Sequence, residues 1–74
     1  MPDPKNWLAT LEYRYGDRGG VKGMVAIFNN GMPYDDQAQL VKEQYRISIA
    51  TANRNRVRLI EMGLVEPKSA RIES

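Results

Sequence analysis

The chain has 74 residues and contains neither cysteine nor histidine. Disulfide bridges, thiolate zinc sites and histidine-dependent catalysis are therefore excluded, and the sequence predicts neither a metal nor a cofactor. The formal net charge is only +2, yet the isoelectric point of about 9.2 indicates that basic residues predominate locally.

One small domain is expected, because the chain is short and has no internal repeat. We place this domain at residues 1–66 and a flexible tail at residues 67–74. A domain of this size is only marginally stable alone, so a homodimer is expected. No apolar run approaches the roughly 20 residues that span a membrane, and the segment around Asp3 does not resemble a signal peptide. These features predict a cytoplasmic protein that does not contact a membrane.

The first predicted helix covers residues 4–15. Asp3 can cap it, and Pro4 occupies the first helical position, which proline favours. A helix would gather four apolar side chains on one side, namely Trp7, Leu8, Leu11 and Tyr15. The alternation of Leu11, Tyr13 and Tyr15 with charged residues would also suit a strand, but the helix is favoured.

A glycine-rich loop is predicted at residues 16–20, where three glycines weaken any regular element. Such a loop could cradle a phosphate, but the Lys-Ser/Thr pair of a phosphate-binding loop is missing, so a plain connector is favoured. A second helix, expected to belong to the core, is predicted at about 21–30. Its apolar residues recur with a helical period: Val21, Met24, Val25, Ile27 and Phe28.

A third helix is predicted at about 35–45, with Asp35 as its cap and Asp36 near its positive end. Met32 and Tyr34 are expected to pack beneath the junction that precedes it. Only residues 46–47 separate this helix from the next one. So short a connection suits two helices that cross steeply, which is the geometry of a helix-turn-helix.

The fourth predicted helix runs over about 48–62. Ser48 can cap its first turn, and Gly63 stands where helices commonly end in a left-handed residue. Leu64 and Val65 can then fold back onto the helix, while Pro67 prevents its continuation.

Residues 46–58 hold four arginines and no acid, interleaved with two asparagines. Arginine matches the edge of guanine or a phosphate, and asparagine matches the edge of adenine, so this mixture suits nucleic acid. The helical period separates an inward face, with Ala52, Leu59, Ile60 and Gly63, from an outward face, with Ala50, Thr51, Arg54 and Arg58. Small side chains at the leading end would let the backbone approach a groove floor. DNA contact is therefore favoured over a merely solvated face.

Arg56 falls on the inward side and needs a partner. Its guanidinium could reach the rim of the core, pair with Glu43 or Glu12, or lie in a dimer interface. The sequence does not choose among these.

Residues 21–65 resemble the winged-helix repressors of the MarR and GntR groups. In those families a first helix ends at a Gly-Pro-like break, a short second helix follows, and a recognition helix of the form S-x-x-T-x-x-R ends in G-L-V before a β-wing. The matching residues of this chain are Ser48, Thr51, Arg54, Leu59, Gly63, Leu64 and Val65. The resemblance implies an all-α fold, or an α fold with a minimal β-wing, around a three- to four-helix helix-turn-helix core.

Two departures from that pattern carry expectations of their own. Arg46 stands where such turns usually have glycine, and a left-handed conformation there would cost roughly 1 to 2 kcal/mol. The residues after Val65 have no β-branched run long enough for two strands, so any wing is vestigial. Lys68 and Arg71 could instead follow the phosphate backbone as a basic tail.

The predicted function is sequence-specific binding of double-stranded DNA, as in a transcriptional regulator of a phage, plasmid or similar element. The 48–62 helix would enter the major groove. The residues expected to contact DNA are Arg46, Ser48, Ala50, Thr51, Asn53, Arg54, Asn55, Arg58 and Lys68. An architectural role in recombination or DNA packaging is an alternative within the same class.

A protein-interaction module, such as an antirepressor or a polymerase-binding inhibitor, is the rival prediction. It is motivated by aromatic residues that can anchor an interface: Trp7, Tyr13, Tyr15 and Tyr34. An enzyme is disfavoured. Asp35 and Asp36 are adjacent and would point in different directions on a helix, and Ser48 has no histidine to activate it.

Overall fold

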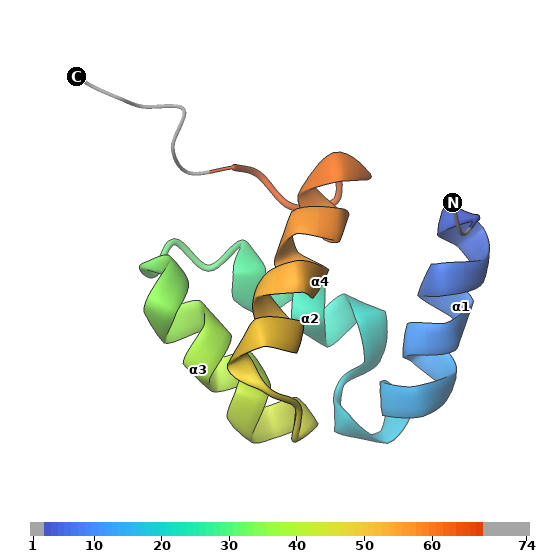
Figure 1. Cartoon of the computed structure of the whole chain (residues 1–74), viewed down its shortest axis with the longest axis horizontal. Coiled ribbons are helices and arrows are strands. Elements are labelled where there is room, and N and C mark those ends of the chain that lie inside the picture. The colour runs from blue at the N-terminus through green and yellow to red at the C-terminus, as the bar shows by residue number, and fades with distance from the viewer. Residues whose placement is uncertain (1–2, 68–74) are drawn as a thin grey trace.

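The computed structural model describes residues 3–67, which form an all-α fold (Figure 1). Within this part of the chain there are four α-helices and one 3-10 turn: α1 (Pro4–Tyr15), η1 (Gly16–Arg18), α2 (Gly20–Phe28), α3 (Tyr34–Tyr45) and α4 (Ile49–Glu61). The predicted all-α class is confirmed. Residues 3–67 contain no strand, so a minimal β-wing has no counterpart there.

Helix α1 begins and ends where the sequence predicted. Asp3 is extended, and its Oδ1 accepts a hydrogen bond of 3.0 Å from the backbone N–H of Lys5, while Pro4 occupies the first helical position. The capping hydrogen bond satisfies an amide that the helix itself leaves open. The strand alternative for this segment is therefore wrong.

The predicted loop at 16–20 is more regular than expected, because Gly16–Arg18 form the 3-10 turn η1. Gly19 has a φ of 118° and lies close to the side chains of Gln44 and Tyr45 at the end of α3. A Cβ there would come within 2.7 Å of both Gln44 Nε2 and the Tyr45 hydroxyl, so glycine is required for space as well as for conformation. Helix α2 then starts one residue earlier than predicted and ends at Phe28.

Helix α3 begins at Tyr34, with Pro33 rather than Asp35 as its N-cap. The prediction that Asp35 caps this helix is wrong, since the extended Pro33 already provides the carbonyl that accepts from Gln37 N at 3.0 Å. Asp35 and Asp36 both lie in the first turn, where a carboxylate suits the positive end of the helix dipole.

The junction before α3 is less buried than expected. Met32 is 37% exposed, so the expectation that it packs beneath the junction is wrong. Tyr34 is half-buried, in keeping with its predicted packing.

Helix α4 has a side-chain cap at its start and a glycine motif at its end. Ser48 Oγ accepts from Thr51 N at 3.1 Å. At the other end, Gly63 has a φ of 79°, its N–H donates to Ile60 O at 2.9 Å, and Leu64 N donates to Leu59 O at 3.0 Å. This pair of bonds is a Schellman motif. The chain then returns Val65 to the core, where it is 2% exposed, whereas Leu64 remains 41% exposed.

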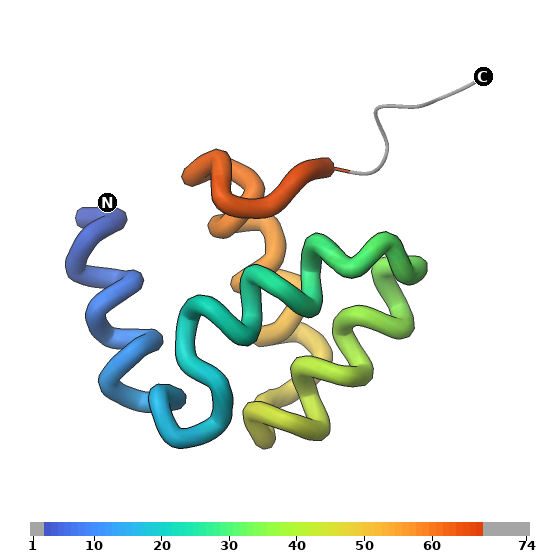
Figure 2. The backbone as a smooth tube through the Cα atoms, turned by 180° about the vertical axis from the view of Figure 1, so that it is seen from behind, coloured from blue at the N-terminus to red at the C-terminus, as the bar shows by residue number. Residues whose placement is uncertain are grey.

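All four helices contribute buried side chains to the core, α1 through Leu11. α3 and α1 lie on opposite sides of the α2 and α4 pair, in both views of the molecule (Figures 1 and 2). The largest fully buried side chains are Tyr45, Phe28, Met24, Leu59, Gln37 and Val41. No helix within residues 3–67 combines the length and apolar character needed to cross a membrane.

Candidate nucleic-acid interface

Helix α4 presents one open face to solvent and packs the opposite face into the core. Ala52 and Leu59 are fully buried and belong to the hydrophobic core. On the other side Ala50, Arg54 and Glu61 are exposed, as predicted for the first two. At about 100° per residue these positions fall on a single arc of the helix. The candidate interface is therefore the arc that runs from Ala50 to Glu61.

Ser48 and Thr51 are engaged with each other at the start of α4. The Ser48 hydroxyl donates to Thr51 Oγ1 at 3.0 Å and accepts from the Thr51 backbone N–H. Thr51 is half-buried. Their first role is thus to fix the helix start, which places the two side chains at the border of the open face.

Asn55 does not lie on the open face, which corrects the prediction that it contacts DNA. Its side chain is 5% exposed, and its Nδ2 donates to Met24 Sδ of α2 at 3.8 Å. The reason is its spacing: Asn55 follows Ala52 by three residues and precedes Leu59 by four, so it continues the buried stripe.

Arg58 lies at the edge of the open face and is half-buried. Its guanidinium carbon lies 5.2 Å from the centre of the Trp7 ring of α1, a cation–π contact. Arg58 therefore extends sideways toward α1, at the flank of the arc, rather than straight out from α4.

Arg56 obtains a partner that the sequence did not indicate. Its guanidinium carbon lies 4.1 Å from the centre of the Tyr34 ring, and its Nη1 donates to Asn53 Oδ1 at 2.5 Å. Neither suggested acid binds it: Glu12 accepts from Val21 N, and Glu43 accepts from Gln39. The guanidinium thus lies at the rim of the core, between an aromatic ring and an amide.

Arg46 adopts the left-handed conformation in the turn between α3 and α4, with φ 59° and ψ 49°. Among the described residues, Arg46 is the only one other than glycine with a positive φ. Its backbone N–H donates to Lys42 O at 2.8 Å. This conformation costs a residue with a Cβ roughly 1 to 2 kcal/mol. The side chain itself is exposed, next to the amino-terminal end of α4.

Val57 belongs to the open face and was missed by the sequence analysis. It is 44% exposed, and the helical period places it between Asn53 and Ala50. The same period that assigned Arg54 outward could have found it. An exposed apolar side chain there suits contact with the methyl group of thymine.

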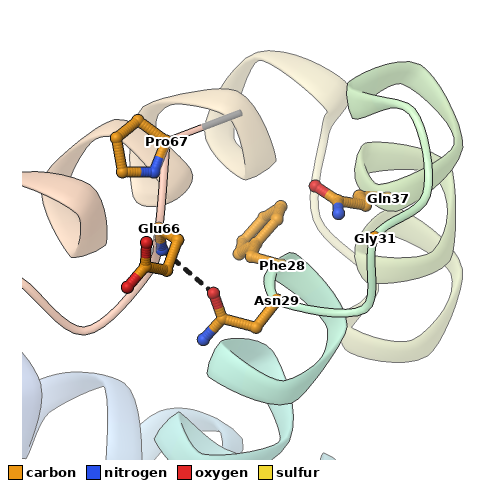
Figure 3. Close-up of a pocket in the computed structure, with 6 residues that line it drawn as sticks. All are labelled: Phe28, Asn29, Gly31, Gln37, Glu66 and Pro67. Atoms are coloured by element: carbon orange, nitrogen blue, oxygen red, sulfur yellow. Dashed lines mark hydrogen bonds between the residues drawn. The ribbon is translucent and has the colours of Figure 1, made fainter. Parts of the chain in front are cut away.

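The segment after α4 is fastened to the carboxyl end of α2 by one side chain (Figure 3). Asn29 Nδ2 donates to Leu64 O, and Asn29 Oδ1 accepts from Glu66 N, each at 3.0 Å. Beside it lies a hollow of about 240 Å³, lined by Phe28, Asn29, Gly31, Gln37, Glu66 and Pro67. This volume is below the roughly 300 Å³ at which small-molecule sites begin, so the hollow is not the candidate site.

Three of the four aromatic residues proposed as interface anchors are engaged within the chain. Trp7 meets Arg58, Tyr34 meets Arg56, and the Tyr15 ring lies 5.7 Å from that of Tyr45 in an edge-on arrangement. Tyr13 is 92% exposed on α1. Lys68 and Arg71 lie outside the described residues.

Comparisons with known proteins return no match: no family model, no curated protein and no solved structure matches this chain.

Proposed function

We propose that this chain is a non-enzymatic, sequence-specific DNA-binding protein that inserts α4 into a major groove. The observation that carries the proposal is the open arc of α4. It combines a small residue at the leading end, Ala50, with a base-reading arginine, Arg54, and an apolar contact, Val57. A helix fits the width of the major groove, and these side-chain types read base edges there.

Basic residues at the borders of the arc supply phosphate contacts in this proposal. Arg46 precedes α4 and is exposed, and Arg58 follows at the α1 side. Contacts of this kind orient a protein on the duplex without reading sequence. Together the two arginines bracket the residues that face the bases.

The regulatory role is part of the same proposal. The resemblance of residues 21–65 to MarR and GntR type repressors supports a transcriptional regulator of a phage, plasmid or similar element, acting as a homodimer in the cytoplasm. A regulator of this type would rely on α4 and its turn, since residues 3–67 contain no strand for a wing.

Selection of bound sequences from a random duplex library tests the proposal. An enriched palindrome is expected, with a half-site spacing that reports the distance between two recognition helices. Retained affinity without any enriched sequence would instead favour an architectural role, which measured bending of the bound duplex would establish. No retention of any duplex at low salt would contradict DNA binding altogether.

Substitution of Arg54 gives the residue-level test, with Arg14 as the matched control. Both side chains are exposed arginines, but Arg14 lies on α1. We expect Arg54→Ala to weaken binding to the selected duplex by about 1–3 kcal/mol, and Arg14→Ala to change it by much less. Equal losses of affinity for the two variants would show that Arg54 contributes only its positive charge and does not read a base.

One observation favours the rival function, a protein-interaction module. Tyr13 is almost fully exposed, and tyrosine is a frequent anchor of protein interfaces. This role predicts a single stoichiometric protein partner that is captured by the wild-type chain and lost with Tyr13→Ala. Salt-sensitive DNA binding that survives Tyr13→Ala would favour the DNA proposal.

A further inference from the structure

Three side chains from two helices, Tyr34, Arg56 and Asn53, contact one another in that order at the border of the open face. Tyr34 of α3 lies beneath the guanidinium of Arg56, and Arg56 Nη1 donates to Asn53 Oδ1 at 2.5 Å. Arg56 and Asn53 are one helical turn apart on α4, and both are half-buried. These contacts therefore link Arg56, on the core side of α4, to Asn53, nearer the side that faces solvent.

The chemistry of arginine decides which end of the Asn53 amide faces Arg56. A guanidinium carries five N–H donors and no acceptor, so only the amide oxygen can receive its hydrogen bond. The Nδ2 group of Asn53 then lies on the other branch of the amide. Since Arg56 is itself held against the Tyr34 ring, a reversal of the amide would lose a charge-assisted hydrogen bond.

We infer that Arg56 is a positioning residue that makes Asn53 a hydrogen-bond donor toward the ligand. This inference rests on the proposed DNA binding by α4. A free asparagine pairs with adenine by donating to N7 and accepting from the N6 amino group, which requires its oxygen. Because Arg56 turns the oxygen away, Asn53 presents its Nδ2 group and selects a base whose major-groove edge offers an acceptor. Guanine, thymine and adenine offer one, through O6 or N7, O4 and N7 respectively, whereas cytosine offers only its N4 donor.

A measurement on the protein without DNA tests the orientation itself. In the carbon NMR spectrum, the side-chain carbonyl resonance of Asn53 reports the hydrogen bond to its oxygen. We expect Arg56→Met to shift this resonance, while the control Arg54→Met, on the open face of the same helix, leaves it in place. An unshifted resonance in Arg56→Met would overturn the inference, whatever the protein does with DNA.

Selection from random duplexes tests the consequence for specificity. The wild type and the conservative variant Arg56→Lys, which keeps a donor, are expected to prefer a base with a major-groove acceptor over cytosine at one position of the site. Arg56→Met and Asn53→Ala are expected to reduce that preference about tenfold while the other positions of the site stay enriched. Arg56→Met is further expected to admit cytosine there, because the freed amide can reverse and accept from the N4 amino group.

The outcomes separate the inference from the function on which it rests. If the wild type enriches no sequence, the proposed function fails, and the resonance of Asn53 still decides whether Arg56 orients the amide. If the wild type enriches a site with cytosine at the position that Asn53→Ala alters, DNA binding stands and the inference is wrong. The Arg56→Lys and Asn53→Ala variants keep the test valid if Arg56→Met does not fold.

Discussion

Arg46 shows at the scale of a single residue how local strain and a proposed function can coincide. Its left-handed backbone closes the turn between α3 and α4, and glycine would adopt that conformation without steric cost. A charged residue at this place gives up stability, and the proposed phosphate contact supplies a reason for keeping it.

We expect Arg46→Gly to stabilise the fold and to weaken DNA binding. Relief of left-handed strain is partly offset by the greater freedom of glycine in the unfolded chain, which leaves a gain of about 0.5–1 kcal/mol. Urea unfolding measures the first effect and titration with the selected duplex the second. A gain in stability with unchanged affinity would remove Arg46 from the interface.

Gly23 is limited by space rather than by conformation. A Cβ at this position would stand 2.6 Å from the Tyr45 hydroxyl, which is itself buried and hydrogen-bonded to Gly20 O at 2.8 Å. We expect Gly23→Ala to destabilise the fold by about 1–3 kcal/mol in urea unfolding, as overpacking does. Gly16→Ala is the control, because its neighbour at 3.3 Å is the flexible carboxylate of Glu12. Similar losses in both variants would contradict this explanation.

Single-residue roles were predictable where their cause was local. The Asp3 and Ser48 caps and the Gly63 stop depend on neighbours within a few positions, and all three are confirmed. The assignment of Asn55 to DNA was wrong because it rested on the match between its amide and a base edge, whereas its partner Met24 lies 31 residues away in the chain. The contact between Arg56 and the Tyr34 ring could not be predicted either, because the search for a partner of Arg56 considered charged side chains and not aromatic rings.

At the scale of elements, the boundaries of the helices followed from the sequence because caps and hydrophobic period act within each helix. The predicted and observed bounds agree closely for α1 and α4. The hydrogen bonds between segments that are far apart in the chain could not be predicted from the sequence. Asn29 had indicated only the end of α2, yet it holds backbone groups 35 and 37 residues further along the chain.

We expect Asn29→Ala to loosen the segment after α4 and to destabilise the fold by about 1–2 kcal/mol, since two hydrogen bonds to the backbone are lost. Thermal or urea unfolding measures the change. Gln39→Ala is the control, because it removes an exposed contact to Glu43 within α3 alone and is expected to have little effect. A loss in Asn29→Ala no larger than that of the control would show that burial of Val65 suffices to hold the segment.

At the scale of the whole molecule, Tyr45 connects α3 to the first residues of α2 through its hydroxyl. Burial, and secondarily the charge of Glu12, raise the pKa of Tyr45 above its ordinary value of 10.0. The fold thus favours the neutral hydroxyl. The resulting stability is fully present below the unfolded pKa near 10 and is lost as the pH rises through the folded pKa.

We therefore expect the free energy of unfolding to fall above about pH 10, and the fall to be smaller in Tyr45→Phe. That variant is also expected to be less stable at neutral pH, because Gly20 O loses its partner. Urea unfolding from pH 7 to 11 measures both effects. Tyr13→Phe, at an exposed tyrosine, is expected to retain the wild-type pH dependence. If the free energy of unfolding of Tyr45→Phe falls at alkaline pH as much as that of the wild type, groups other than Tyr45 cause the fall.

The contact between Arg58 and Trp7 makes the chain its own optical probe. Trp7 is the one tryptophan of the sequence, and it lies on α1, whereas the cation over its ring comes from the flank of the open arc of α4 that we propose to bind DNA. Any event that draws Arg58 from the indole to a phosphate changes the surroundings of the only strong emitter. Intrinsic fluorescence can therefore follow an encounter with DNA in real time and without a label.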